Sequence, residues 1–279
     1  MGWAVDQLLG FGAPGLVIAV GFAAITTFGA YWKSDAIALA MSRAKPADPI
    51  EHARLHNLVE GLCIASGLPK PRVYVVEDAA PNAFATGRNP KHAAIAVTTG
   101  LLEKMNRVEL EGVLAHELSH IKNYDILITT LAVTMVGAIV LLADLSMRMM
   151  WFGGVRSSGN DRDGDRGGGF GPLMVVGLVL LITAPLAAKL MQFAMSRRRE
   201  MLADVSGVGM TRYPPGLISA LEKLRDDSTV VTSASRATAH LWIESPLARI
   251  ESEGTHTRLN RMFDTHPPLE ERIEALREL

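Results

Sequence analysis

Three long apolar stretches dominate the hydrophobic pattern of the chain, at residues 13–32, 126–147 and 172–191. Each has about the 20 residues that a helix needs to cross the hydrocarbon layer of a bilayer. Buried core helices are seldom this long and this free of charge, so the pattern predicts three transmembrane helices. Asp144 and Lys189 fall near the ends of two stretches, where their polar groups can reach the membrane interface.

Basic residues near the ends of the stretches predict how the chain is oriented in the membrane. Lys33 follows the first stretch, Lys122 precedes the second, and a run of three arginines at 197–199 follows the third. With three spans, all of these residues fall on one side of the membrane, which is expected to be the cytoplasm.

The soluble part of the chain is therefore predicted to be split in two. Residues 33–125 and 192–279 share the cytoplasmic side, and a membrane hairpin separates them in the sequence. The hairpin includes the glycine-rich segment 148–171, which is expected to form an outer loop.

Shorter patterns in the soluble part predict a mainly helical α+β fold. Strands are expected at 72–76 and 93–98, in a small antiparallel sheet, with a turn-rich segment at 81–90 between them. Apolar residues at helical spacing predict helices at 49–66, 103–120, 216–224 and 269–279.

Charge and cysteine content exclude several kinds of protein. The 28 basic and 29 acidic residues give a net charge of −1, so there is no overall basic field to attract nucleic acid. Cys63 is the only cysteine, which rules out a disulfide framework within the chain and a cysteine-rich zinc site.

A metal-binding pattern stands in the helix predicted at 103–120. His116, Glu117 and His120 form the sequence HExxH. On a helix, residues four apart lie on one face, so both imidazoles can reach one ion at about 2.0–2.1 Å. Glu117 lies beside them and can take a proton from a water molecule.

A catalytic zinc ion usually has three protein ligands, and Glu200 is the candidate for the third. The two spans of the hairpin bring its segment back to the membrane side on which His120 stands. Asp204, one helical turn after Glu200, can accept a hydrogen bond from the far ring nitrogen of a ligand histidine, His116 in particular. The alternatives are a counter-charge to the arginines for Glu200 and a solvated carboxylate for Asp204.

Other readings of these residues remain open. A non-catalytic membrane scaffold or chaperone could use zinc for structure, although such sites normally fill all four positions with protein ligands. A zinc transporter would be expected to carry polar ligands near the span centres, and these spans have none. His52 and His56 fit a solvated helix face. Asp125 either orients the end of the HExxH helix or marks the membrane interface.

Four ordered motifs resemble the HtpX-type membrane zinc metalloproteases, which are bacterial heat-shock proteases of the inner membrane. The resemblance runs from about Tyr31 to the C-terminus. It rests on PNAFATGRNPKHAAIAVTTGLL (81–102), ELEGVLAHELSHIKNYD (109–125), SRRREMLAD (196–204) and THPPLEERI (265–273).

The resemblance implies a role for each matching residue. It implies one zinc ion per chain bound by His116, His120 and Glu200, with Glu117 as general base and Asp204 as a hydrogen-bond partner of a ligand. The remaining matches are Asn82 and Ala83, implied to contact the substrate backbone on an edge strand, and His266 and Arg272, implied to donate to the developing oxyanion.

The resemblance also implies a biological setting. It predicts an endopeptidase of protein quality control and the stress response in the bacterial inner membrane, acting on unfolded or damaged membrane proteins from the cytoplasmic side. Its partners are then lipid and protein substrates, with the oligomeric state left open, a homo-oligomer included. Two departures stand out: the family usually has two apolar segments before the catalytic part, and Met201 replaces an aromatic residue.

Overall fold

The computed structural model describes residues 29, 31–132, 134–135, 139, 197–229, 231, 241–243 and 267–279. The predicted span at 172–191 and the loop at 148–171 lie outside these residues, as do most of the spans at 13–32 and 126–147. Among the described helices, none combines the length and the hydropathy of a membrane span. The predicted spans and boundaries therefore stay predictions.

One compact unit combines Lys33–Val133 with Leu190–Leu279. Its chain order places a small sheet before the helices that carry the candidate ligands. The strands are β1 (Lys45–Pro46), β2 (Arg72–Val76), β3 (Ala83–Gly87) and β4 (Ala93–Thr98). The helices are α3 (Ala53–Ser66), η1 (Pro90–His92), α4 (Thr99–Lys104), α5 (Arg107–Lys122), α8 (Arg197–Thr211), α9 (Pro214–Asp226) and α12 (Leu269–Arg277).

The sheet is mixed, with strand order β1-β2-β4-β3. β2 and β4 pair in parallel, with Val73 opposite Ile95, while β3 pairs antiparallel with β4, with Phe84 opposite Ala96. The predicted antiparallel pairing of 72–76 with 93–98 is therefore wrong. The cause is β3 itself: the segment expected to be turn-rich contains a full strand, and the extra strand reverses the chain direction before β4 begins.

The sheet is buried on both faces. On one face, Val73, Ile95 and Val97 belong to the main core cluster, which also includes residues of α3, α5 and α9 such as Leu114 of α5. Phe84, on the other face, meets Trp242 edge to face, with their ring centroids 4.7 Å apart. All six side chains of β4 are buried, so the sheet is a rigid base for the helices.

The helix predicted at 103–120 is divided in the structure. α4 ends at Lys104 and α5 begins at Arg107, because Asn106 caps the new helix. The Asn106 side chain accepts from the backbone N–H of Val108 and of Glu109, and the Glu109 carboxylate accepts from Asn106 N–H at 2.8 Å. This reciprocal capping box defines where the helix of the HExxH motif starts.

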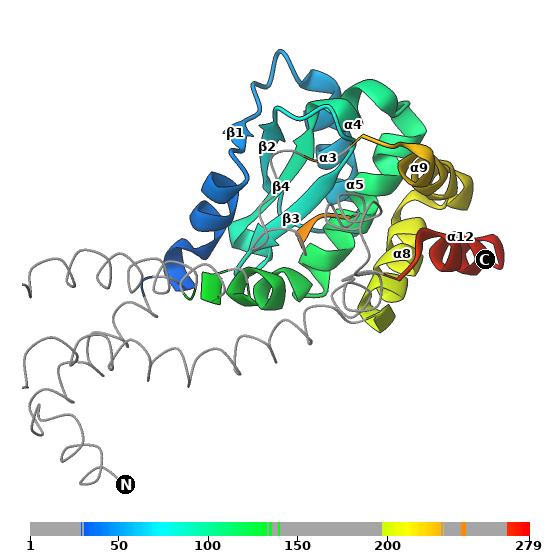
Figure 1. Ribbon diagram of the computed structural model, residues 1–279. Helices are drawn as coiled ribbons and strands as arrows, with labels where there is room; N and C mark the ends of the chain where they lie inside the picture. The colour runs from blue at the N-terminus through cyan, green and yellow to red at the C-terminus, as the bar shows by residue number, and fades with distance from the viewer. Residues whose placement is uncertain are drawn as a thin grey trace, which may run out of the picture. The chain divides into compact units, whose positions relative to one another are not determined.

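α5 is the central helix of the unit. It contacts α3 and β3, and α8 and α9 also pack against it, while α12 contacts both of these helices. Figure 1 shows α8, α9 and α12 gathered beside α5. The contacts of α5 place the candidate site inside a helical layer that the sheet supports.

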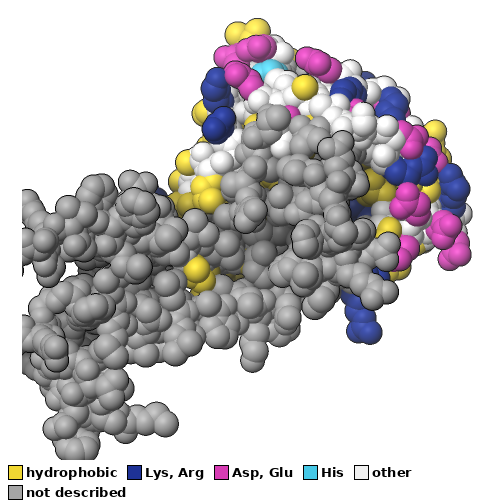
Figure 2. Space-filling view, in the orientation of Figure 1, with side chains coloured by type: hydrophobic (Ala, Val, Ile, Leu, Met, Phe, Trp, Pro, Cys, Tyr) yellow, Lys and Arg dark blue, Asp and Glu magenta, His cyan; other side chains and the backbone are white. Residues whose placement is uncertain are grey.

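The exposed surface carries acidic and basic side chains side by side, as the described part of Figure 2 shows.

Candidate metal centre

The HExxH residues lie in the C-terminal half of α5, which is largely buried. His116 and Glu117 are 0% and 2% exposed, and eight consecutive residues, 112–119, are buried. The sheet covers one side of this helix and α8 covers another. A helix so enclosed presents its polar side chains to other protein groups rather than to bulk water.

α8 approaches α5 at unusually short range because it carries a glycine at the crossing. A Cβ at position 207 would lie 3.0 Å from the backbone N of His116 and 3.2 Å from its Cα. Glu200, Asp204 and Gly207 are spaced as i, i+4 and i+7, which places them on one face of α8. The absence of a side chain at Gly207 therefore lets the two carboxylates reach the histidines.

The three predicted ligands come together at this crossing. Nε2 of His116 lies 3.2 Å from Nε2 of His120, and the Glu200 carboxylate oxygens lie 3.7 and 3.6 Å from these two nitrogens. One ligand atom from each residue lies within 4.8 Å of the others. Ligands at about 2.0–2.1 Å from a tetrahedral ion are about 3.3 Å apart, so the set fits a zinc-sized ion.

A carboxylate and an arginine hold His116 from behind. Asp204 Oδ1 lies 2.8 Å from His116 Nδ1, which assigns the proton to Nδ1 and leaves Nε2 to face Glu200. Arg272 donates to both oxygens of Asp204, at 2.8 and 2.7 Å. All three side chains are buried, so this network is fixed in place.

The charges of this network suit metal binding. Burial lowers the pKa of His116 to about 4, against the opposing effect of Asp204, so its ring is neutral as a ligand must be. Burial alone would raise the pKa of Asp204, but Arg272 and His116 outweigh it and hold this pKa at about 2. Asp204 is therefore an anion at any physiological pH.

His120 differs from His116 in its electrostatics. Burial lowers its pKa, but the carboxylate of Glu200 and a hydrogen bond with Asp125 outweigh that effect and raise the pKa to about 9. A metal ion that binds at Nε2 would have to displace the proton that this ring otherwise holds at neutral pH. Asp125 Oδ2 lies 3.1 Å from His120 Nδ1. The two histidines thus each have a carboxylate at Nδ1 and turn Nε2 toward Glu200.

The other predicted site residues are only partly placed by the structure. Asn82 precedes β3, the last strand of the sheet, and its backbone N–H donates to Thr98 Oγ1 at 2.9 Å. Ala83 begins β3, and its carbonyl accepts from Ile243 N–H at 2.9 Å. His266 lies outside the described residues. Arg272 stands within the site, with Nη2 3.4 Å from His116 Nδ1.

Sequence reasoning missed some of the residues that shape the site. Gly207 and Ile243 lie outside the sequence motifs, so no pattern distinguishes them. In the sequence, Arg199 is one of three consecutive arginines, but in the structure its Nε lies 3.7 Å from Asp125 Oδ1. Its position next to Glu200, facing the end of the HExxH helix, is the signal that could have found it.

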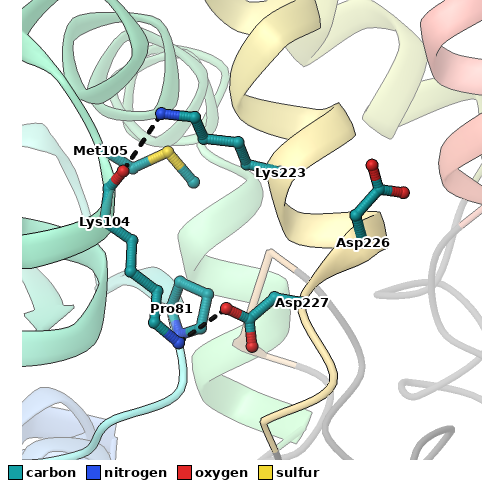
Figure 3. A pocket seen from close by; sticks show the side chains of 6 residues that line it. All are labelled: Pro81, Lys104, Met105, Lys223, Asp226 and Asp227. Carbon is teal, nitrogen blue, oxygen red and sulfur yellow. Dashed lines mark hydrogen bonds and ion pairs between the residues drawn. The ribbon is translucent and has the colours of Figure 1, made fainter.

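A cavity of about 310 Å³ lies apart from the ligands, between α4, α9 and the segment before β3 (Figure 3). Its charged groups already have partners. Lys104 Nζ lies 2.6 Å from Asp227 Oδ2, and Lys223 Nζ donates to the carbonyl of Lys104 at 3.2 Å. The residues that line it are Pro81, Lys104, Met105, Lys223, Asp226 and Asp227. These contacts tie α4 to α9.

Comparisons with known proteins agree with the geometry. The family model of peptidase family M48 matches residues 49–279. A "Protease HtpX homolog" of Thermoanaerobacter pseudethanolicus is 46% identical over 269 residues, covering 96% of this chain and 86% of the relative. Another with the same name, from Dictyoglomus turgidum, is 43% identical over 275 residues, covering 99% and 85%.

A solved structure shares the fold. The crystal structure of S. mikatae Ste24p superposes with a TM-score of 0.50 at 18% identity. The match covers 98% of this chain and 66% of the Ste24p chain. At this identity the likeness concerns the fold alone.

Proposed function

Because the chain belongs to peptidase family M48 and is a metalloprotease of that family, we propose that it is a zinc-dependent endopeptidase that cleaves damaged or misfolded membrane proteins. The observation that carries the proposal is the meeting of His116, His120 and Glu200 within 4.8 Å, with Glu117 next to a ligand on the same helix. One zinc ion per chain is proposed, because this is the one such ligand set among the residues that the structure describes.

A zinc ion held there would polarise the scissile carbonyl and lower the pKa of a water molecule. Three protein ligands leave a coordination position open, which is typical of catalytic rather than structural zinc sites. Glu117 would take the proton of the attacking water and pass it to the leaving amine. Its buried position keeps this proton transfer away from bulk solvent.

The remaining predicted residues have roles that fit their places. An extended peptide could pair with β3, since main-chain pairing aligns any sequence. Such a peptide would compete with Ile243 for the carbonyl of Ala83. His266 and Arg272 are proposed to stabilise the developing oxyanion, and the pairing of Arg272 with Asp204 brings its positive charge beside the ligands.

The setting of the proposed reaction is the bacterial cytoplasmic membrane, with the catalytic unit on the cytoplasmic side. The apolar stretches at 13–32, 126–147 and 172–191 and the basic residues at their ends support it. An epitope added at the C-terminus should be protected from an external protease in intact spheroplasts and digested in inverted membrane vesicles. Digestion in intact spheroplasts would overturn this orientation.

The proposed activity is tested on full-length protein purified in detergent. Wild type and Glu117→Gln are incubated with unfolded casein, with zinc or with a chelator, and zinc per chain is measured. Wild type should cleave and lose activity with chelator. Glu117→Gln should keep its zinc and lose at least about 100-fold in rate, as for removal of a general base. Equal cleavage by both proteins would overturn the mechanism, and zinc without cleavage in either would favour a scaffold.

A further inference from the structure

A second carboxylate, Asp125, contacts a metal ligand from outside the HExxH motif. Its Oδ2 lies 3.1 Å from Nδ1 of His120, the nitrogen opposite the one that faces Glu200. The Asp125 side chain is 9% exposed and that of His120 is 15% exposed. The contact is therefore largely shielded from water. A hydrogen bond is stronger in such a low-dielectric environment than in water.

The backbone between the two residues is bent to make this contact. α5 ends at Lys122, and Asn123 N–H still bonds to Ser119 O at 2.9 Å. Tyr124 then adopts a φ of +62°, in the left-handed region that few residues other than glycine enter. Helix resumes directly after this turn, and Asp125, five residues after His120, lies with its carboxylate against the His120 ring. Backbone strain of this kind persists where the surroundings require it.

An arginine from another helix faces the same carboxylate. Nε of Arg199 lies 3.7 Å from Oδ1 of Asp125, an ion-pair distance rather than a direct hydrogen bond. Arg199 immediately precedes the ligand Glu200 in α8. Asp125 therefore stands between His120 of α5 and the start of α8, and each of its oxygens has a separate partner.

The arrangement parallels the one at His116. There, Asp204 accepts from the ring at Nδ1 and is held in turn by Arg272. Both histidines thus have a carboxylate at Nδ1 and an arginine behind it. A ring held in this way has one tautomer and one orientation, and its Nε2 is a better electron donor to a metal.

We propose that Asp125, supported by Arg199, is a positioning residue that orients His120 and sets the metal affinity of the site. The inference rests on the proposed zinc site and adds the second of its two orienting carboxylates. Loss of such a partner typically costs 10–100-fold in metal affinity, so Asp125→Ala is expected to bind zinc about 10–100-fold more weakly.

The test measures zinc affinity by competition with a chromogenic chelator, together with the visible absorption spectrum of the cobalt-substituted protein. Wild type, Asp125→Ala, Asp125→Asn and Arg199→Gln are compared. Asp227→Ala is the matched control, because it removes a partly buried carboxylate from an ion pair, with Lys104, outside the site. Asp125→Ala should weaken zinc binding and alter the cobalt spectrum, Arg199→Gln should do so to a smaller extent, and Asp227→Ala should match wild type.

The outcomes separate this inference from the proposed function. Wild-type affinity and spectrum in Asp125→Ala would overturn the positioning role and leave the zinc site intact. If Asp125→Ala does not fold, Asp125→Asn tests the metal affinity, because it keeps the side-chain volume and an acceptor oxygen but removes the charge; wild-type affinity there would overturn the claim that this carboxylate sets the metal affinity. A wild-type protein that binds no zinc would overturn the proposed zinc site and this inference with it.

Discussion

Gly207 of α8 lies against the backbone of His116 in α5, so close that even a Cβ would be tightly packed there. A Cβ at position 207 would sit 3.0 Å from His116 N, closer than ordinary van der Waals contact. Both partners are helix backbone and cannot rotate away as a side chain would. α5 and α8, which supply the metal ligands, can therefore lie this close because position 207 carries a hydrogen atom in place of a methyl group.

Gly207→Ala should accordingly push α8 away from α5 and weaken both the fold and the metal site. Overpacking of a buried contact typically costs about 1–3 kcal/mol, and a shift of α8 moves Glu200 with it. Chemical denaturation and zinc competition measure the two effects.

Gly209→Ala is the control for this prediction. It lies on the same helix, and a Cβ there would meet nothing within 4 Å. This variant should bind zinc as wild type does and gain roughly 0.5–1 kcal/mol from helix propensity. If Gly207→Ala also bound zinc as wild type does and were more stable, the close approach of α8 to α5 would not contribute to stability or to zinc affinity.

Arg272 should be essential for stability as well as for the site. It is 1% exposed, and its charge is balanced by Asp204, which accepts two of its hydrogen bonds. Breaking a buried pair by removing one partner leaves an uncompensated charge and typically costs about 3–5 kcal/mol. Arg272→Gln should lose stability by about this amount in denaturant titrations.

The matched control for Arg272 lies five residues further along α12. Arg277 pairs with Glu222 at 2.7 Å, but its side chain is 60% exposed. Exposed pairs contribute about 0–1 kcal/mol, so Arg277→Gln should be nearly neutral. Equal losses of folding stability in Arg272→Gln and Arg277→Gln would show that burial of the Arg272–Asp204 pair does not increase its contribution to stability.

The capping carboxylate of α5 should make stability depend on pH. Burial alone would raise the pKa of Glu109, but the ammonium group of Lys223, the N–H of Asn106 and the hydroxyl of Ser219 together lower it below its usual value. A pKa lower in the folded than in the unfolded state gives stability that is present above the unfolded value, about 4.3, and is lost as pH falls through the folded value.

Glu109→Gln removes this contribution. The variant should be less stable than wild type by about 1–2 kcal/mol at pH 7, and the gap should narrow as pH falls below about 4.3. Thermal unfolding from pH 7 to pH 3 measures it, with Glu103→Gln on the exposed face of α4 as control. A gap that stays constant over this range would show that the Glu109 charge does not stabilise the fold.

The local part of the site could be predicted from the sequence, and the long-range part could not. His116 and His120 follow from helical spacing, and the same spacing relates Glu200 to Asp204. The pairing of Arg272 with Asp204, by contrast, joins residues that are 68 positions apart, and no local pattern encodes it. The contact of Asp125 with His120 depends on the left-handed turn at Tyr124, which favours glycine and is not evident from a tyrosine.

The sheet shows the same limit. The β-branched residues at 72–76 and 93–98 predict the two strands, but they do not predict the relative direction of these strands. It depends on β3, whose sequence AFATG is flanked by Pro81, Asn82 and Pro90, all typical of turns. The strand is stabilised by burial between β4 and Trp242 rather than by its own propensity, so only the tertiary structure shows it.

The most direct test of the account compares zinc content and cleavage in two carboxylate variants of the full chain. Glu200→Gln removes a ligand and Glu117→Gln removes the base, so their effects should separate. The account predicts that Glu200→Gln loses both zinc and cleavage, whereas Glu117→Gln keeps one zinc ion per chain and loses cleavage. One zinc ion per chain in Glu200→Gln, or undiminished cleavage by Glu117→Gln, would contradict it.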